Sequence, residues 1–389
     1  MSVLKIATAG SVDDGKSTLI GRLLYDTKSL TDDKLEAIKT SSKKKGYDYL
    51  DFSLATDGLV AEREQGITID VAHIYFSTET RSYIIADTPG HIEYTRNMVT
   101  GASTSQASII LIDARKGVIE QTYRHFFINN LLRVKHIIVA INKMDLVNYS
   151  EEIFNRIKTE FNKLNSQSDF AEQQITFIPV SALYGYNVAQ LSEKMNWYQG
   201  ETILYHLENL KLDDSNSEEA RFPVQNVIRP MSDEHHDFRG YGGRVAGGVF
   251  KPGDKVTVLP TGLTSTIKTI ELFDKKLEKA YPPMSVTMTL EDDINLSRGD
   301  MIVRGDNQPE VTQDIEMMVC WMDDKPLQLN GLYAIKHTTR EARCKIVDIK
   351  YKVDVNTLSR LEEENNVGKN DIARITIRST QPLYIDKYR

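Results

Sequence analysis

Eight residues near the start of the chain have the types and spacing of a phosphate-binding loop. Residues 10–17 read Gly-Ser-Val-Asp-Asp-Gly-Lys-Ser, which is the pattern G-x-x-x-x-G-K-[ST]. Glycines let such a loop curl so that successive backbone N–H groups point at phosphate oxygens. The Lys16 ammonium would reach the β- and γ-phosphates, and the Ser17 hydroxyl would ligate Mg²⁺. The residues predicted to bind a nucleoside triphosphate here are Gly10, Ser11, Val12, Asp13, Asp14, Gly15, Lys16, Ser17 and Thr18.

A second set of residues indicates which base is bound. Asn142, Lys143 and Asp145 follow the apolar run 137–141. A carboxylate accepts from two N–H donors side by side, and guanine offers that pair at N1 and N2, whereas adenine has an acceptor at N1. Asp145 would therefore select guanine, so that GTP is the expected substrate, and Lys143 would lie along the face of the base. Backbone groups of a third loop are expected to touch the guanine oxygen: Ser181, Ala182 and Leu183.

Residues between these two motifs would sense the γ-phosphate. Asp87 follows the apolar run 83–86 and would hold Mg²⁺ through a water molecule, while the Gly90 N–H would bond the γ-phosphate. His91 would orient the attacking water, and Thr68 would complete the Mg²⁺ shell when GTP is bound. The two loops that contain these residues would act as switches, ordered by the γ-phosphate and Mg²⁺. The predicted catalytic residues are thus Lys16, Thr68 and His91, and the predicted Mg²⁺ ligands are Ser17, Thr68 and Asp87.

The elements that must position these loops are apolar strands that alternate with helical stretches up to about residue 211. This alternation predicts a mostly parallel sheet, in which ligands bind at the carboxyl ends of the strands, where these loops fall. From residue 222 onward, short β-rich runs such as 255–259 and 285–290 are separated by turns such as 251–254. The predicted fold is an α/β P-loop GTPase domain followed by two small antiparallel β-barrel domains.

Three domains are expected: a GTP-binding domain over 1–212, a β-barrel over 220–311 and a second β-barrel over 312–389. The polar, acidic segment 213–219 is the predicted linker. In the last domain, two runs of alternating apolar residues predict strands with one buried face. These apolar residues are Val347, Ile349, Tyr351 and Val353 in the first run, and Ala373, Ile375 and Ile377 in the second.

Two other patterns that suggest chemistry have simpler interpretations. The Gly-rich segment 239–244 has no helix after it, which favours a strand with a bulge over a second phosphate loop. His235 and His236 lie among acidic residues, but their spacing favours a polar hairpin loop over a metal site.

Composition excludes several classes of protein. A hydrophobic content of 40% and a charged content of 26% are ordinary for a globular protein. The net charge of −7 argues against a dominant nucleic-acid footprint. The chain has no apolar run of about 18 residues, so no membrane-spanning helix is expected. The first predicted strand begins almost at Met1, which leaves no room for a signal peptide. Cys320 and Cys344 are predicted to be reduced. Both expectations favour a cytoplasmic location.

Together these motifs resemble a translation-factor-type GTPase related to elongation factor Tu. Ser11 and Asp14 stand where elongation factors usually carry histidines. The amino-acid sequences of four further segments resemble those of the large, GTP-hydrolysing subunit of bacterial sulfate adenylyltransferase. These segments are 61–72, 94–104, 113–117 and 297–300.

The resemblance implies a GTPase that binds a smaller catalytic subunit as its partner. In that family, GTP hydrolysis in the large subunit drives the uphill formation of adenylyl sulfate and pyrophosphate from ATP and sulfate. The adenylyl transfer itself belongs to the smaller, catalytic subunit. By analogy with elongation factor relatives, Val12 and Ile67 would flank His91 and hold it away until a partner rearranges them.

Two other functions remain open from the sequence. One is an elongation-factor-like GTPase that carries aminoacyl-tRNA, against which the acidic charge and the Ser11/Asp14 pair argue. The other is a scaffold whose GTP switch only gates assembly of a complex.

The end of the chain departs from the family pattern. Relatives usually continue through one more hairpin that completes the last barrel. An unpaired edge strand is therefore expected here, with aggregation or reduced stability of this chain. The chain also shows no kinase-like extension, so a fused adenylyl-sulfate kinase is not expected in this polypeptide.

Overall fold

The computed structural model describes residues 2–44, 46–55, 72–88, 95–166, 172–211, 219–229, 238–273, 275–305, 307–354, 359–362 and 366–387. Thr68, Gly90 and His91 lie outside the described residues, as do Ile67, the predicted linker up to residue 218, and His235 with His236. The chain divides into two compact units. The first contains Met1–Lys211, Val353–Leu361 and Lys369–Ile372, and the second contains Leu212–Lys352, Glu362–Gly368 and Ala373–Arg389.

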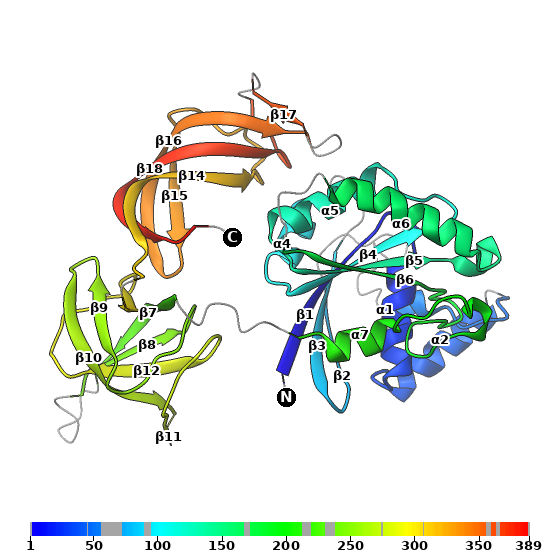
Figure 1. Cartoon of the computed structure of the whole chain (residues 1–389), viewed down its shortest axis with the longest axis horizontal. Coiled ribbons are helices and arrows are strands. Elements are labelled where there is room, and N and C mark those ends of the chain that lie inside the picture. Colours follow the sequence, from blue (N-terminus) through cyan, green and yellow to red (C-terminus); the bar gives the residue numbers. More distant parts are fainter. Residues whose placement is uncertain are drawn as a thin grey trace. The chain divides into compact units, whose positions relative to one another are not determined.

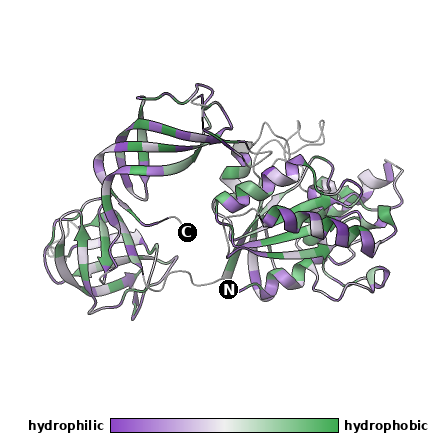
Figure 2. Ribbon diagram, turned by 45° about the horizontal axis from the view of Figure 1, so that its top comes forward, coloured by the Kyte–Doolittle hydropathy of each residue, from purple (hydrophilic) through white to green (hydrophobic). Residues whose placement is uncertain are grey.

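A six-stranded sheet forms the centre of the first unit (Figure 1). Its strands, in spatial order, are β2 (Ala72–Ser77), β3 (Arg81–Asp87), β1 (Ser2–Ala9), β4 (Ala107–Asp113), β5 (His136–Asn142) and β6 (Gln174–Pro179). β2 pairs with β3 in an antiparallel manner, and the other neighbours are parallel. Every residue of β4 and β5 is buried, which is why these strands are mostly apolar and do not alternate. Figure 2 shows green, hydrophobic strands at the centre of this unit.

Helices lie on both faces of this sheet (Figure 1). They are α1 (Lys16–Asp26), α2 (Asp32–Lys44), α4 (Thr95–Ala102), α5 (Glu120–Leu131), α6 (Glu151–Asn165) and α7 (Ile203–Asn209). Short 3₁₀ turns occur at η1 (Phe52–Ala55), η3 (Met144–Val147) and η4 (Glu193–Met195). In α6 the buried side chains recur at helical spacing, at Phe154, Ile157, Phe161 and Leu164. The Ser150 hydroxyl caps this helix by accepting from the Ile153 N–H at 3.3 Å.

The strand order contains a reversal at the centre of the sheet. The chain leaves β1 toward β2 and β3 on one side, and then passes back across β1 to continue through β4, β5 and β6 on the other side. In open sheets of this kind, ligands bind outside the carboxyl ends of the strands where the order reverses. The crevice for a ligand is therefore at the ends of β1 and β4. The mostly parallel sheet predicted for this part of the chain is confirmed.

The second unit begins with a closed antiparallel sheet. Seven strands run in the order β11-β10-β12-β8-β7-β13-β9, and β10 also pairs with β9, which closes the barrel. The strands are β7 (Ala220–Ile228), β8 (Gly240–Arg244), β9 (Lys255–Leu259), β10 (Leu263–Leu272), β11 (Lys275–Lys276), β12 (Ser285–Leu290) and β13 (Met301–Arg304). The predicted Gly-rich strand is β8, and its pairing with β7 contains a register shift between Val224 and Asn226, as expected for a bulge.

A further antiparallel sheet follows, with strands in the order β14-β18-β16-β15. The strands in this part of the chain are β14 (Glu310–Cys320), β15 (Leu332–His337), β16 (Arg340–Val353), β17 (Arg360–Leu361) and β18 (Ile372–Ile385). Its core includes Ile346, Ile349, Ala373, Ile375 and Ile377.

The alternation predicted for residues 347–353 is wrong at its first residue. Ile346 is buried and Val347 is 48% exposed, whereas Ile349 is again buried. In a regular strand every second residue faces the core, but here two residues lie between the buried Ile346 and the buried Ile349. The alternation therefore shifts by one residue at this point, as it does in an irregular strand. The alternation predicted at Ala373, Ile375 and Ile377 is confirmed.

The two β sheets of the second unit contact one another. Tyr384 of β18 joins a buried cluster with Leu259, Met301 and Val303 of the barrel. Arg221 and Asp386 form a bidentate ion pair, with N–O distances of 3.0 and 2.8 Å.

The domain boundaries at residues 212, 220 and 311 stay predictions. Among the described residues, none of the helices combines the length and the apolar character that crossing a membrane requires.

Candidate nucleotide-binding site

The predicted site residues that the structure describes come together at the carboxyl edge of the first sheet. The ends of its strands lie side by side, because Thr8 of β1 pairs with Asp87 of β3 and Asp113 of β4 pairs with Asn142 of β5. The loops that follow these strands therefore start at the same edge. Of the predicted phosphate-loop residues, Gly10, Ser11, Asp14 and Lys16 are buried, Val12, Gly15, Ser17 and Thr18 are half-buried, and Asp13 is exposed.

The loop between β1 and α1 has the curl that phosphate binding requires. Gly15 adopts φ +93° directly before the helix, a conformation that glycine takes at no steric cost. The Asp14 carboxylate accepts a hydrogen bond of 2.7 Å from the Ser11 N–H, and the Asp14 N–H donates to the Ser11 carbonyl at 3.2 Å. The residue before α1 is Gly15, which has no side chain with which to cap the helix. Its first N–H groups and its positive dipole end are thus suited to an anion.

Lys16 lies between the ends of β1 and β3. Its ammonium donates to the Thr88 carbonyl and lies 3.8 Å from Asp87 Oδ1. Burial lowers the pKa of Lys16, while the carboxylates of Asp87 and Asp14 act in the opposite direction. The Thr8 hydroxyl donates to Asp87 Oδ1 at 3.0 Å, which fixes this buried carboxylate. Together these contacts place a cation at the mouth of the phosphate loop.

The described donors fit Mg²⁺ by their chemistry. Ser17, in the first turn of α1, offers a hydroxyl oxygen, and Asp87 offers a carboxylate oxygen. Mg²⁺ prefers oxygen ligands and usually takes only one or two carboxylates together with substrate phosphates.

Asn142 links the phosphate loop to the loop after β6. Its Nδ2 donates to the Asp14 carbonyl at 2.8 Å, and its Oδ1 accepts from the Ala182 N–H at 3.0 Å. Lys143 follows in a left-handed conformation, with φ +62°, and its ammonium donates to the Asp13 carbonyl. The predicted base-binding and phosphate-binding loops are therefore held together by side chains of the same dipeptide.

Asp145 is oriented by the third loop. The Ser181 hydroxyl donates to Asp145 Oδ1 at 2.6 Å, and Ser181 is itself fixed by backbone hydrogen bonds with Tyr186. The carboxylate is half-buried. In the part of the chain that the structure describes, no protein partner is seen for Oδ2, which leaves this oxygen for a ligand.

Sequence reasoning did not single out the charged side chains of the loop after β4. Asp113 is buried, and Arg115 holds it with hydrogen bonds of 3.0 and 2.6 Å. Burial raises the pKa of Asp113, but hydrogen bonds from Arg115 and Lys143 outweigh it and bring the pKa to about 2. Lys143 lies 3.1 Å from Asp113, and Lys116 lies 3.5 Å from Asp14. Segment 113–117 attracted attention only as part of the family resemblance.

A buried histidine near the site was also missed. His125 of α5 is 4% exposed, and burial, followed by the positive charges of Lys16 and Arg124, lowers its pKa to about 3. Its imidazole is therefore neutral near pH 7. A histidine on the inner face of a helix carries no sequence signal that separates it from other core residues.

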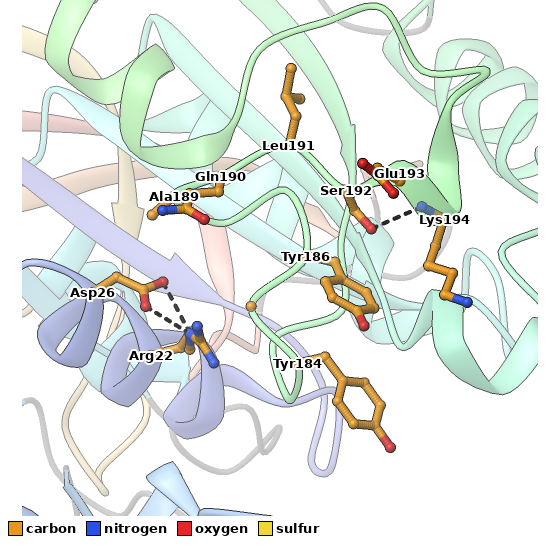
Figure 3. Close-up of a pocket in the computed structure, with 11 residues that line it drawn as sticks. Arg22, Asp26, Tyr184, Tyr186, Ala189, Gln190, Leu191, Ser192, Glu193 and Lys194 are labelled. Atoms are coloured by element: carbon orange, nitrogen blue, oxygen red, sulfur yellow. Dashed lines mark hydrogen bonds and ion pairs between the residues drawn. The ribbon is translucent and has the colours of Figure 1, made fainter.

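A depression of about 420 Å³ lies beside the site (Figure 3). Arg22 and Asp26 of α1 form an ion pair of 3.0 Å on one side of it, and Tyr184 and Tyr186 lie on another. Tyr184 directly follows the predicted guanine loop, but none of the predicted nucleotide-binding residues lines the depression.

Replacing Gly15 by Ala is expected to damage the site. The residue has φ +93°, and a Cβ there would lie 2.5 Å from Asn142 Nδ2, which would displace the side chain that links the loops. We expect the free energy of unfolding to fall by about 2 kcal/mol and GTP affinity to fall with it.

Gly46→Ala is the matched control for Gly15→Ala. Gly46 has φ +74° in the same unit, with no atom near its Cβ position. It should lower the midpoint of thermal unfolding slightly and leave GTP affinity unchanged. Equal GTP affinity for the Gly15→Ala variant and the unmodified chain would contradict the role given to Asn142.

Comparisons with known proteins identify relatives of both parts of the chain. The family described as Elongation factor Tu GTP binding domain matches residues 1–200, and the family described as GTP-eEF1A C-terminal domain-like matches residues 314–389. The chain is 50% identical over 389 residues to the Bifunctional enzyme CysN/CysC of Mycobacterium tuberculosis (strain CDC 1551 / Oshkosh), with 100% of this chain and 63% of that protein covered.

Two further relatives share one name. Sulfate adenylyltransferase subunit 1 of Bacteroides fragilis (strain YCH46) is 51% identical over 393 residues, with 100% of this chain and 80% of that protein covered. The protein of the same name from Pseudoalteromonas atlantica (strain T6c / ATCC BAA-1087) is 49% identical over 389 residues, with 99% and 81% covered. The chain thus spans less than two thirds of the length of the first of these relatives and about four fifths of the length of the other two.

Proposed function

Because the chain belongs to the family of sulfate adenylyltransferase subunit 1, with a GTP-binding domain of the elongation factor Tu type, we propose that it is the GTPase subunit of a sulfate-activating enzyme. GTP hydrolysis on this chain drives a partner catalytic subunit to form adenylyl sulfate and pyrophosphate from ATP and sulfate. The observation that carries this proposal is the 51% identity to a named subunit 1 along the whole chain. The convergence of the guanine and phosphate loops through Asn142 supports the GTP site.

The residues of the phosphate loop account for binding of the triphosphate. N–H groups at the start of α1 and the Lys16 ammonium stabilise the charge that develops on the β- and γ-phosphates. Ser17, Thr68 and, through water, Asp87 would hold Mg²⁺, which would neutralise further phosphate charge when bound. Asp145 accepts from the guanine N1 and N2 groups, and Ser181 holds the carboxylate in place.

Hydrolysis requires a water molecule in line with the γ-phosphate. His91 orients this water in the proposal, and the Gly90 N–H bonds the γ-phosphate. Both residues lie outside the described part of the chain, so their roles rest on the sequence pattern. Slow intrinsic hydrolysis is expected, which the catalytic subunit accelerates when ATP and sulfate are present.

The test uses the chain together with its catalytic partner. Adenylyl sulfate formation from ATP and sulfate should rise when GTP is added, with GTP consumed in step with product. A non-hydrolysable GTP analogue should give no such rise. If the analogue supports the same rate and yield as GTP, the chain gates assembly and does not couple energy. If GTP has no effect and the chain retains aminoacyl-tRNA, the sulfate-activating function is wrong.

Replacing His91 by Ala is expected to separate hydrolysis from binding. Loss of the residue that orients water should lower kcat for GTP hydrolysis by about 10²-fold, with GTP affinity within about twofold of the unmodified chain. Phosphate release over time measures kcat, and titration with GTP measures the affinity. A large loss of GTP affinity would show that His91 supports the structure of the pocket instead.

Four finer proposals accompany this function. The chain works in the cytoplasm and pairs with the catalytic subunit. Nucleic acid is not expected among its partners. It comprises a GTP-binding domain over 1–212 and β domains over 220–311 and 312–389.

A further inference from the structure

The phosphate loop of this chain contains a buried carboxylate that needs a counter-charge. Asp14 is 2% exposed and lies within the loop that would surround the triphosphate. It closes the loop on itself by accepting from the Ser11 N–H at 2.7 Å. A carboxylate is an unfavourable neighbour for phosphate oxygens, since like charges repel strongly where water is excluded.

Lys116 supplies this counter-charge from the loop after β4. Its ammonium lies 3.5 Å from Asp14 Oδ1, and no other cation forms an ion pair with Asp14 among the residues that the structure describes. The turn that projects Lys116 is fixed, because the N–H groups of Lys116 and Gly117 donate to the Asp113 carbonyl at 2.9 and 3.0 Å. This turn follows the end of β4, at the reversal of the strand order where the ligand crevice is expected.

The other charges near Asp14 have partners of their own. Asp113 repels Asp14, but its carboxylate is held by Arg115 and Lys143. The Lys16 ammonium is directed at Asp87 and the Thr88 carbonyl. Among the described residues, Lys116 is therefore the cation that pairs directly with Asp14, and its loss would leave the Asp14 charge offset only through space by the Lys16 ammonium.

We infer that Lys116 is a positioning residue of the nucleotide site, which pairs with Asp14 so that this carboxylate can hold the phosphate loop closed without repelling the triphosphate. The inference rests on the proposed GTP-binding function and assigns it a residue outside the loops predicted from the sequence. Asp14 and Lys116 act as one unit in this arrangement. The effect of changing Lys116 must then depend on whether residue 14 carries a charge.

A double-mutant cycle on the full-length chain tests this dependence. Affinities for GTP and GDP are measured by titration with Mg²⁺ for the unmodified chain, Lys116→Met, Asp14→Asn and the double variant. Asparagine can still accept from the Ser11 N–H, so Asp14→Asn removes the charge and keeps the loop-closing acceptor. Lys116→Met should weaken GTP binding about tenfold when Asp14 is present, because the ion pair is partly exposed and its loss leaves a buried charge.

In the Asp14→Asn background the same change should weaken GTP binding by less than about twofold, since no buried charge is left unpaired. Lys116→Arg keeps the positive charge and should retain most of the affinity. Lys163→Met removes the same charge from the exposed face of α6 and serves as the matched control, with affinity unchanged. The midpoint of thermal unfolding, measured for each variant, separates loss of binding from loss of structure.

The outcomes distinguish this inference from the proposed function. Equal losses of GTP affinity for Lys116→Met in both backgrounds, or a loss that Lys116→Arg shares in full, overturn the inference while GTP binding stands. If Lys116→Met lowers the unfolding midpoint too far for titration, the comparison between Lys116→Arg and the unmodified chain still decides the question. If the unmodified chain binds no guanosine nucleotide, the proposed function itself fails.

Discussion

Replacing Asp145 by Asn is expected to move the nucleotide preference of the chain from GTP to xanthosine triphosphate. In the proposed site, the carboxylate would present two acceptor oxygens to the N1–H and N2–H₂ donors of guanine. The amide presents a donor in place of one of these acceptors, which suits the O2 acceptor of xanthine. A site built on such bonds rejects a mismatched base strongly, and we expect GTP affinity to fall by about 10²–10³-fold.

The hydrogen bond from Ser181 can be kept in the Asp145→Asn variant, so the exchange changes only the group that faces the base. The Ser181 hydroxyl donates to Asp145 Oδ1 at 2.6 Å, and an Asn oxygen can accept the same bond. The NH₂ group of the amide then takes the place of Oδ2, the oxygen without a described protein partner. Titrations with GTP, xanthosine triphosphate and ATP measure the shift.

Glu193→Gln is the matched control for Asp145→Asn. It removes a carboxylate from the neighbouring depression and should leave the preference for guanine unchanged. A preference for guanine that survives Asp145→Asn would overturn the role given to this loop.

The position of the site followed from the sequence because parallel strands have a simple signature. The apolar runs 83–86, 137–141 and 176–180 correspond to β3, β5 and β6. β5 is buried on both faces, which explains its lack of alternation, whereas β3 and β6 are partly buried. Once strands are parallel, the loops after them must meet at one edge of the sheet. The residues that end each run, such as Asp87 and Asn142, were therefore predictable at the same edge of the sheet.

The side-chain partners within the site were not predictable in the same way. Lys116 and Asp14 are 102 residues apart, and nothing in either local pattern specifies that they meet. Asn142 was expected to face the base, whereas its amide also bridges the phosphate loop and the Ala182 N–H. Such contacts depend on rotamers and on the exact strand register, which tertiary packing decides.

The same limit explains the error at Val347. Strict alternation is a property of a regular strand, and it fails wherever one strand gains a residue relative to its neighbours. Ile346 and Ile349 are both buried, so the apolar residue between them faces outward despite its type. The preference of a single side chain is weaker than the geometry of the sheet that contains it.

Replacing Lys16 by Met is expected to abolish tight binding of both GTP and GDP. The ammonium reaches the β-phosphate as well as the γ-phosphate in the proposed site, so both nucleotides lose the same charge-assisted contact. Methionine has a similar length and no charge, and we expect affinity to fall by at least about 10³-fold, since a desolvated cation–phosphate contact is lost. Titration calorimetry with Mg²⁺ and each nucleotide measures this loss.

The free energy of unfolding should change far less than the affinity in the Lys16→Met variant. Burial already disfavours the charged form of Lys16, as its lowered pKa shows, so an apolar side chain removes a desolvation cost while it deprives Asp87 of its cation. These two effects oppose one another, and Asp87 keeps its hydrogen bond from Thr8. A loss of affinity below tenfold would show that Lys16 belongs to the buried Asp87 cluster alone, whereas a large loss with an unchanged unfolding midpoint assigns its charge to the phosphates.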